Sequence, residues 1–398
     1  MSSDSSGDQD SARTILQVSA SSLSFIASLC IIVMILISPK KLTSPYGRII
    51  FGMSFGDVVQ SLAMLTGPFS VSSINACNWN GFAFTCGTIA VPLYMFTLSL
   101  RYFCKLNLKM SDEKFARKIE RWIHLVVIVF VLSTCIAGLV MKLYNPMPSE
   151  AVCFFEEYPT GCLKDPETYG ECERGMQSFN FVIAVSFVLC LCLVGVTINM
   201  TMLCINSCWI ERTYSNRTQL STSVHSSDRS SARDYLRCLS CWNYNQLPQE
   251  ADSDYVLRLY RMETIIQSSL YVGAFYVSYL PPVLQSIFSM VGVRLPSIIL
   301  LIISFFYPLG GFLNVMVYVR PKVVRIRHGI PGCSRLRAFL VVLKNGGEMP
   351  DLESDPNAMK ICIARRSNTN IEDTNEISNL SFGASRNSLF NMLVSFSE

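Results

Sequence analysis

Long stretches without charged side chains alternate with polar segments along most of the chain. A transmembrane α-helix needs roughly 20 predominantly apolar residues to cross the hydrocarbon layer. Seven stretches reach this length. They lack the strict alternation of barrel strands, and lipid offers the backbone no hydrogen-bond partners, so each is predicted to be a helix. The expected helices cover residues 14–38, 48–70, 77–106, 122–144, 177–209, 261–292 and 296–320.

Basic residues are concentrated in every second connection between these helices. The connections after the first, third, fifth and seventh helices hold 3, 7, 7 and 7 Lys or Arg residues, whereas the N-terminal segment and the other connections hold 1, 0, 3 and 1. Cytoplasmic loops carry the excess of Lys and Arg. The expected fold is therefore an all-α membrane protein, a seven-transmembrane helix bundle with its N-terminus outside and its C-terminus in the cytoplasm.

Composition agrees with a core surrounded by lipid. Half of the 398 residues are hydrophobic and only 16% are charged, which is too few charges for a soluble chain of this length. The Ser- and Asp-rich residues 1–13 lack the pattern of a removable signal peptide, so the first helix is expected to serve as an uncleaved signal. We expect a multi-pass protein, in the plasma membrane, with an extracellular tail at 1–13 and a transmembrane domain at 14–325.

Several connecting segments have a composition of their own. Residues 211–258 and 345–398 are rich in Ser, Thr and Asn, and we expect them to be disordered in the cytoplasm. Residues 321–344 mix basic and apolar side chains and suit a segment lying in the membrane interface, interrupted near Gly329. The basic segment 101–121 is expected to face anionic lipid, with a partner protein as the sharper alternative.

Four of the 16 cysteines fall outside the membrane on the extracellular side: Cys77, Cys153, Cys162 and Cys172. Four oxidised cysteines allow three pairings. Cys77 begins the third helix and Cys172 precedes the fifth, so a bridge between them would fasten the long second outer loop over the bundle. We favour Cys77 with Cys172 and Cys153 with Cys162, while the other two pairings stay open.

Two groups of cysteines lie on the cytoplasmic side. Cys238 and Cys241 have the spacing of metal ligands, but no second pair of this kind follows, so we interpret them as reduced or lipidated thiols and expect no metal there. Cys333 stands beside basic residues near the membrane and is the better candidate for lipidation.

Polar and helix-breaking residues inside the spans are candidates for function. Asp57 is the only acid well inside a span, and an intramembrane carboxylate is costly unless it serves an ion, a proton or a partner. Pro281 and Pro282 remove backbone hydrogen bonds from the sixth helix and favour a kink. Pro308, close to two glycines, weakens the seventh helix.

In this order along the chain, these features resemble motifs of the G-protein-coupled receptor superfamily. Ser54-Phe-Gly-Asp57 resembles its helix-2 sodium-site aspartate motif, which implies a possible sodium ion at Asp57. Phe275-x-x-Ser-Tyr279-Leu-Pro281 aligns with its helix-6 Phe-x-x-Cys-Trp-x-Pro switch, and Tyr279 replaces the tryptophan.

The third and seventh helices extend the resemblance. Asn314 and Tyr318, after two glycines, are similar to the helix-7 pattern of the cyclic-AMP-receptor and secretin-like branches and differ from the rhodopsin-like Asn-Pro-x-x-Tyr. Arg101 and Tyr102 match the superfamily's Asp-Arg-Tyr site, although Leu100 replaces the acid. A divergent receptor that mixes rhodopsin-like and cyclic-AMP-receptor-like features fits best.

The resemblance implies a mechanism. An unknown extracellular ligand would enter a pocket between the third, fifth, sixth and seventh helices and stabilise a state in which the sixth helix has moved outward about Pro281. A heterotrimeric G protein would then bind at the cytoplasmic end. The expected pocket residues are Tyr94, Phe181, Tyr279 and Gln285. The expected activation switch comprises Asp57, Arg101, Tyr102, Phe275, Tyr279, Pro281, Pro308, Asn314 and Tyr318.

Other classes of protein fit less well. A secondary transporter or channel with Asp57 as its ion or proton site is the alternative, but the chain has no obvious repeat between its halves. A retinal protein needs a lysine in the seventh helix, and residues 295–319 contain none. The three histidines and the lack of a nucleophile set argue against an enzyme. We expect no cofactor and no nucleic-acid partner, and membrane lipid is an expected partner.

Overall fold

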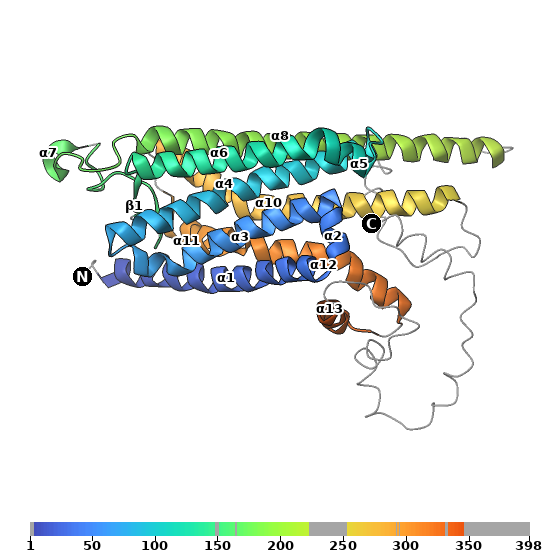
Figure 1. The fold of residues 1–398 in the computed structure, drawn as a ribbon, viewed down its shortest axis with the longest axis horizontal. Helices are drawn as coiled ribbons and strands as arrows, with labels where there is room; N and C mark the ends of the chain where they lie inside the picture. The colour runs from blue at the N-terminus through green and yellow to red at the C-terminus, as the bar shows by residue number, and fades with distance from the viewer. Residues whose placement is uncertain are drawn as a thin grey trace, which may run out of the picture.

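The computed structural model describes residues 4–147, 151–163, 165–222, 253–291, 293, 295–330 and 333–345. Most of these residues lie in long helices that run side by side (Figure 1). The long helices are α1 (Asp4–Ile37), α3 (Pro45–Ser70), α4 (Ile74–Leu106), α6 (Arg121–Val140), α8 (Ser178–Thr222), α10 (Ser253–Met290), α11 (Ser297–Phe306) and α12 (Gly310–Gly329). The short elements are α2 (Pro39–Thr43), α5 (Asp112–Phe115), η1 (Ala116–Glu120), β1 (Tyr144–Pro146), β2 (Cys153–Phe155), α7 (Pro166–Tyr169), η2 (Tyr307–Leu309) and α13 (Arg335–Lys344).

Among the described residues, six helical segments are long and apolar enough to cross a membrane, which indicates a multi-pass membrane protein. They are formed by α1, α3, α4, α5 to α6, α8, and α11 to α12. Helix α10, which covers the expected sixth helix, is not among the six. Its sequence intersperses Ser, Tyr, Gln and two prolines with aliphatic residues.

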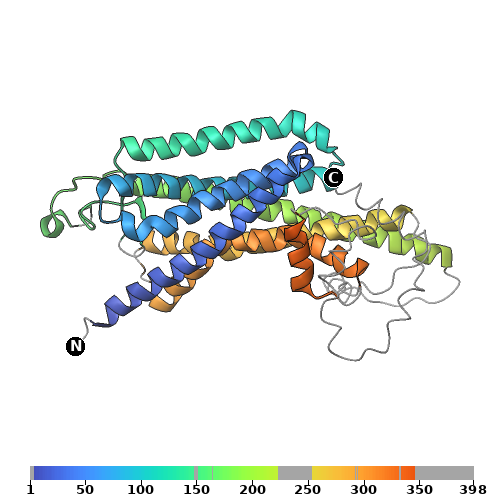
Figure 2. The ribbon, with the colours of Figure 1, turned by 60° about the horizontal axis from the view of Figure 1, so that its bottom comes forward.

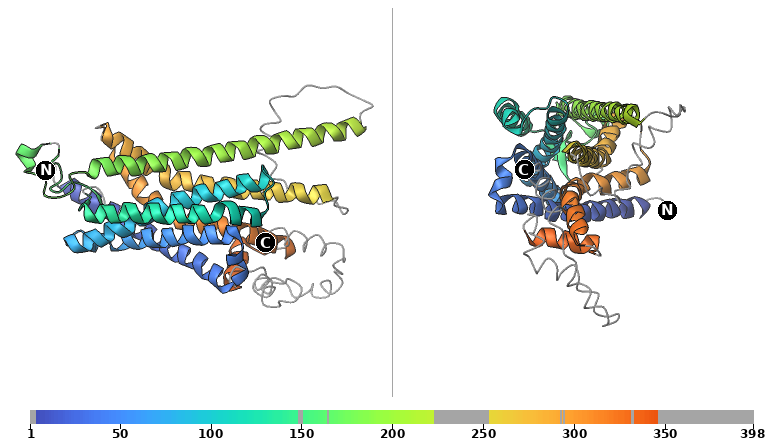
Figure 3. Two further views of the ribbon diagram at one scale, coloured as in Figure 1. Left: turned by 45° about the horizontal axis from the view of Figure 1, so that its top comes forward. Right: turned by 90° about the vertical axis from the view of Figure 1, so that its right-hand side faces the viewer.

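Helix α4 lies at the centre of the bundle. It packs against α3, α6, α8 and α10, and 67% of its most apolar stretch is buried, compared with 22% for α6 and α8. Large apolar side chains of α6 such as Leu125, Val126 and Val129 are exposed. A continuous apolar face of this kind is unfavourable in water and suits contact with lipid tails. Figure 3 shows the helices of the bundle from the side and from one end.

Small residues allow α3 and α4 to approach closely. A Cβ atom on Gly87 of α4 would lie 2.8 Å from the backbone oxygen of Gly56 on α3 and would overlap the side chain of Gln60. Glycine therefore permits a contact between helix backbones that any larger residue would prevent, as in many helix pairs within membranes.

Four helices extend well beyond the expected apolar spans. Helix α1 begins at Asp4 and not at residue 14, α8 continues to Thr222, α10 already begins at Ser253, and α12 continues to Gly329. The expected disorder of residues 211–258 is therefore wrong at both ends, while 223–252 lie outside the described residues, as do Cys238 and Cys241. The apolar pattern marks only the part of a helix inside lipid, and a helix can continue into water where the solvent satisfies its polar side chains.

The last span is interrupted where the sequence predicts a weak point. The α-helix gives way to the 3₁₀ turn η2 at Tyr307–Leu309, which contains Pro308 and precedes Gly310. Helix α12 then continues to Gly329, and α13 follows a bend. The expected interruption of segment 321–344 is thus confirmed, although its first part belongs to α12. The expected tail at 345–398 lies outside the described residues after Asn345.

The two ends of the bundle differ. The start of α1, strand β1 and helix α7 lie at one end, and α2, α5 and α13 lie at the other (Figure 1). The turned view keeps α13 and the start of α1 at opposite ends (Figure 2). We call these the hairpin end and the basic end, because the first carries the β1–β2 hairpin and the second carries the basic segment 101–121.

The hairpin determines the disulfide pairing. Strands β1 and β2 pair antiparallel, with Pro146 opposite Cys153, and the Cys153 N–H donates to Asn80 Oδ1 on α4 at 3.1 Å. This places Cys153 beside the first turn of α4, where it bonds to Cys77.

The other two outer cysteines, Cys162 and Cys172, bond to each other. The same four cysteines are paired as expected, but the favoured pairing of Cys77 with Cys172 and Cys153 with Cys162 is wrong. The strands are only three residues long, so their pattern did not reveal that the loop folds back onto α4.

Cys333, the candidate for lipidation, is not accessible in the structure. It is 5% exposed and disulfide-bonded, so it offers no free thiol to a fatty acid. The turn between α12 and α13 holds it inward: its backbone N–H donates to Ile330 O at 3.2 Å, and Arg327 Nε donates to its carbonyl at 3.4 Å.

Candidate functional site

A buried polar pair joins α3 to α12 near the middle of the bundle. Asn314 Nδ2 donates to Asp57 Oδ2 at 2.9 Å, and both side chains are 3% exposed. This hydrogen bond satisfies one oxygen of the Asp57 carboxylate. A buried carboxylate without a hydrogen-bond partner would have a high cost in free energy. The structure thus brings together two of the expected switch residues from opposite ends of the sequence.

Hydroxyl groups surround this carboxylate because two glycines leave room for them. A Cβ on Gly311 would lie 2.6 Å from Ser24 Oγ and 3.2 Å from Asp57 Cβ, and would overlap Ser28 Oγ. A Cβ on Gly310 would lie 3.5 Å from Ser278 Oγ and 3.8 Å from Asp57 Oδ1. The Gly311 N–H donates to Ser24 Oγ at 3.1 Å. Helices α1, α3, α10 and α12 therefore all contribute to one polar centre.

Part of this polar centre has no protein partner among the described residues. The hydroxyls of Ser28 and Ser278 are buried and make no hydrogen bond there. Buried hydroxyls are normally satisfied, and each one left unpaired costs free energy. Carboxylate, amide and hydroxyl oxygens are suitable ligands for a small hard cation, so the residues present fit the sodium ion expected at Asp57.

Two of the expected switch residues of α10, Phe275 and Tyr279, lie on either side of Ser278 in the sequence. Tyr279 and Phe275 are each 3% exposed, and their ring centroids lie 5.1 Å apart. The Tyr279 hydroxyl donates to Gln60 Oε1 on α3 at 3.0 Å. Helix α10 remains helical through Pro281 and Pro282, so a hinge there stays a prediction.

Aromatic rings connect this region to the hairpin. Phe154 of β2 lies 5.5 Å from Phe84 of α4, and Phe84 lies 6.2 Å from Tyr307 of η2, measured between ring centroids. Tyr307 in turn lies 5.7 Å from Tyr279 in an edge-to-face arrangement. Phe154, Phe84, Tyr307, Tyr279 and Phe275 therefore form a continuous aromatic chain from the hairpin end to the middle of α10.

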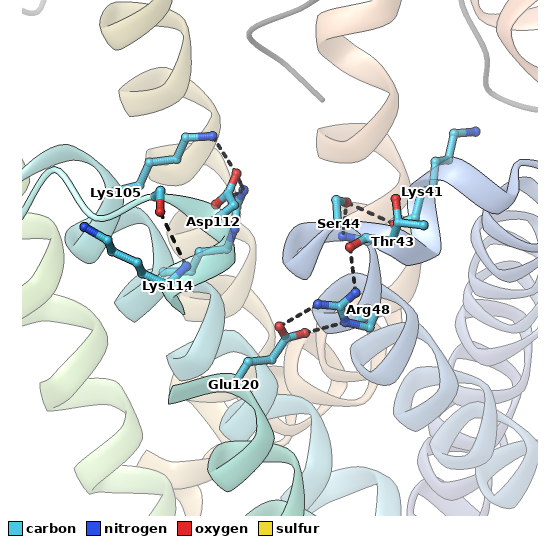
Figure 4. A network of polar contacts seen from close by, with 11 residues as sticks. Lys41, Thr43, Ser44, Arg48, Lys105, Asp112, Lys114 and Glu120 are labelled. Carbon is cyan, nitrogen blue, oxygen red and sulfur yellow. Dashed lines mark hydrogen bonds and ion pairs between the residues drawn. The ribbon is translucent and has the colours of Figure 1, made fainter. Parts of the chain in front are cut away.

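At the basic end, Arg101 forms an ion pair with Asp112, an acid from outside its motif, in which Leu100 stands in the place of the acid. Its Nη2 lies 3.1 Å from Asp112 Oδ1 of α5, while Lys105 Nζ lies 3.0 Å from Asp112 Oδ2 (Figure 4). Arg101 is 6% exposed, and its guanidinium lies over the rings of Tyr46 and Tyr102. Asp112 follows the capping residue Ser111, whose Oγ accepts from Lys114 N. Sequence reasoning missed Asp112, although a Ser before two acids is a recognisable helix start.

Tyrosine hydroxyls join α3 to α10 next to Arg101. Tyr46 and Tyr271 hydroxyls lie 3.2 Å apart, and Gln267 Nε2 donates to the Tyr46 hydroxyl at 3.0 Å. The Tyr318 ring of α12 stacks on Tyr46 at 6.4 Å between centroids. We call Tyr46, Gln267, Tyr271 and Tyr318 the tyrosine cluster. The sequence did not single out the first three, because an isolated Tyr or Gln in a span has no local pattern.

The four residues expected to line a ligand pocket lie in surroundings that differ from one residue to the next. Tyr94 faces α3 and α6: its hydroxyl lies 3.2 Å from His124 Nδ1, and its ring fills the space beside Gly52. Phe181 lies beneath the hairpin, 5.5 Å from Phe155 between ring centroids. Tyr279 belongs to the aromatic chain, and Gln285 is half-buried on α10.

Comparison with models of known protein families finds no match, and comparison with curated protein sequences finds none either.

Proposed function

We propose that this chain is a seven-helix receptor of the G-protein-coupled type, in which a ligand at the hairpin end changes the position of α10 and thereby the binding of a heterotrimeric G protein at the basic end. The aromatic chain carries the proposal. It provides a packed connection between the face that a ligand reaches and the helix whose movement would expose a cytoplasmic surface.

Helix α10 is the seventh span in this proposal. Its polar and aromatic side chains, including Tyr271, Ser278 and Tyr279, are buried in the bundle, while Val277 and Leu284 are exposed. A helix with hydroxyls toward its neighbours and aliphatic groups toward lipid has a lower mean hydropathy than a fully apolar span. It can nevertheless cross a membrane, because the neighbouring helices satisfy the polar groups.

The proposed orientation places the hairpin end outside. Disulfides form and persist in oxidising compartments, and Cys77–Cys153 and Cys162–Cys172 both belong to the hairpin end. The excess of Lys and Arg belongs to the segments of the opposite end, as expected of a cytoplasmic face. The charge rule therefore favours an extracellular N-terminus and a plasma-membrane protein, whereas the disulfides do not by themselves distinguish the two ends, because Cys333 at the basic end is also disulfide-bonded.

Two groups of contacts hold the proposed resting state at the cytoplasmic face. The tyrosine cluster attaches α10 to α3, and Asp112 engages Arg101. An outward movement of α10 would break the hydrogen bonds of Tyr46. The ligand would have to supply this free energy through a higher affinity for the moved state.

A library screen in cells that express a promiscuous G-protein subunit tests the proposal. We expect at least one extracellular ligand to stimulate nucleotide exchange. Replacing Pro281→Ala should reduce this stimulation, because the change restores a backbone hydrogen bond at the proposed hinge. Unchanged stimulation in this variant would rule out the hinge but not the receptor.

One observation favours a second candidate function, a transporter or channel with an ion site at Asp57. The unpaired serine hydroxyls around this carboxylate resemble the oxygen lining of an ion site. Sodium or proton flux through vesicles containing the purified chain, abolished by Asp57→Asn, would support transport. A tight vesicle with no such flux would favour the receptor.

A further inference from the structure

A cavity opens at the basic end between α3 and the start of α6. It has a volume of about 300 Å³ and is lined by Arg48, Ala116, Arg117, Glu120, Arg121 and His124. The segment Ala116–Glu120 forms a π-helical turn directly before α6. Such turns insert an extra residue into a helix and are frequent at functional sites. Here the turn brings four charged or titratable side chains of one segment around one cavity.

The inner part of the cavity is already neutral. Arg48 Nε and Nη2 each lie 2.7 Å from a carboxylate oxygen of Glu120, a two-pronged ion pair shown in Figure 4. Arg48 Nη1 also donates to the carbonyls of Leu42 and Thr43, and His124 Nε2 lies 3.4 Å from Glu120 Oε1. Arg48 is therefore engaged with Glu120 and with α2, and Glu120 is engaged with Arg48 and lies beside His124.

Because Arg48 and Glu120 neutralise each other, the positive charge of the cavity comes from Arg117 and Arg121. Both are exposed at the rim of the cavity. Arg117 Nη2 lies 3.8 Å from Glu113 Oε2, and this pair is 69% and 87% exposed, so it contributes little. Two guanidinium groups beside a neutral floor are suited to bind a phosphate, because each can donate two parallel hydrogen bonds to its oxygens.

The exposed residues on either side of the cavity change from charged to apolar along the chain. Before it, Glu113, Lys114 and Lys118 are exposed and charged; after it, Trp122 is 66% exposed and begins the apolar face of α6. Tryptophan is enriched at membrane–water interfaces. A phosphate bound by Arg117 and Arg121 would thus lie at the depth of the lipid headgroups, with the acyl chains along α6.

We propose that this cavity binds the phosphate headgroup of an anionic phospholipid in the leaflet at the basic end. The site requires only that the chain spans a membrane and does not depend on receptor function. Anionic lipids are concentrated in the cytoplasmic leaflet, which is the leaflet that the basic end faces in the proposed orientation.

Native mass spectrometry of the purified full chain tests the site, with phosphatidylglycerol and phosphatidylcholine as probes. Arg117→Ala/Arg121→Ala should weaken phosphatidylglycerol binding by roughly tenfold or more, and Arg117→Lys/Arg121→Lys should weaken it less. The control Lys114→Ala/Lys118→Ala removes the same charge from the same segment outside the cavity, and its effect should stay below about twofold.

Three results would overturn the proposal. Equal losses in the Arg→Ala and Lys→Ala double variants would indicate diffuse attraction to a basic surface. Equal binding of phosphatidylcholine and phosphatidylglycerol would show that the cavity does not recognise the negative charge of the headgroup. Complete displacement of phosphatidylglycerol by an equimolar amount of inorganic phosphate would identify free phosphate as the ligand.

Discussion

Gly87 shows how a single residue can determine the packing of two helices. It allows the backbones of α3 and α4 to meet, whereas a Cβ on Gly273 of α10 would meet no atom within 4 Å. The two glycines therefore have different physical roles, although both lie within predicted spans and look alike in the sequence.

Gly87→Ala should lower the free energy of unfolding by about 1–3 kcal/mol, because the added methyl group overpacks the contact with Gly56 and Gln60. Gly273→Ala should be neutral or should stabilise α10 by up to about 1 kcal/mol, since alanine is the better helix former. Thermal unfolding of both variants in detergent measures the difference. Equal destabilisation would contradict the close approach of α3 and α4.

Asp57 is the residue at which an ion would act. If sodium binds among Asp57 and the neighbouring serine hydroxyls, replacing choline chloride by sodium chloride should raise the unfolding temperature of the wild type by mass action. The rise should vanish in Asp57→Asn, whatever that variant's own unfolding temperature. The same sodium-dependent rise in both proteins would exclude a sodium site at Asp57.

Helix α5 shows how a short element completes a site. It is four residues long, yet it presents Asp112 to Arg101, whose side chain is only 7% exposed. The neighbouring acid Glu113 is 87% exposed, and its carboxylate lies 3.8 Å from the rim residue Arg117. The two acids are adjacent in sequence, so they form a matched pair for mutation.

Asp112→Asn should cost about 1–3 kcal/mol of stability, because it leaves a buried guanidinium with a weaker partner. Glu113→Gln should change stability by less than about 0.5 kcal/mol. Urea or thermal unfolding of the two variants provides the comparison. A Glu113→Gln effect as large as that of Asp112→Asn would show that Arg101 does not depend on α5.

The long elements could be predicted from the sequence, and many contacts between them could not. Apolar stretches marked the helices of the bundle, and Pro308 marked the break at η2, because these signals are local. The Tyr46–Tyr271 and Gln60–Tyr279 hydrogen bonds join residues more than 200 positions apart and have no local signal. The pair Asp57 and Asn314 was anticipated only as two switch residues and not as a contact.

At the scale of the whole molecule, the hairpin covers α4 and determines which cysteines meet. Tyr144 and Phe155 are buried and stacked beneath it, and Arg174 Nη2 donates to Asn78 Oδ1 on α4 at 2.7 Å. These contacts hold both arms of the outer loop against the bundle. The sequence showed the four cysteines but not this hairpin.

Peptide mapping of the unreduced protein should recover Cys77 linked to Cys153 and Cys162 linked to Cys172. Cys153→Ser should lower stability by about 2–5 kcal/mol, because it releases the hairpin from α4. A peptide that links Cys77 to Cys172 would contradict the arrangement of the outer loop.

The proposed receptor function requires that release of α10 at the basic end activates a G protein, and this can be measured without knowing the ligand. Tyr271→Phe removes the hydroxyl that faces Tyr46 and preserves the ring, so it weakens the attachment of α10 by one hydrogen bond, worth about 1 kcal/mol. The population of the moved state should then rise about fivefold. Tyr169→Phe, on α7 outside the bundle, is the control.

The decisive measurement is the basal rate of nucleotide exchange by a panel of purified heterotrimeric G proteins, with the chain reconstituted in lipid nanodiscs. We predict that at least one G protein exchanges nucleotide several-fold faster with Tyr271→Phe than with wild type or Tyr169→Phe. Identical rates for all three proteins across the whole panel, with folded protein in each nanodisc, would contradict the account.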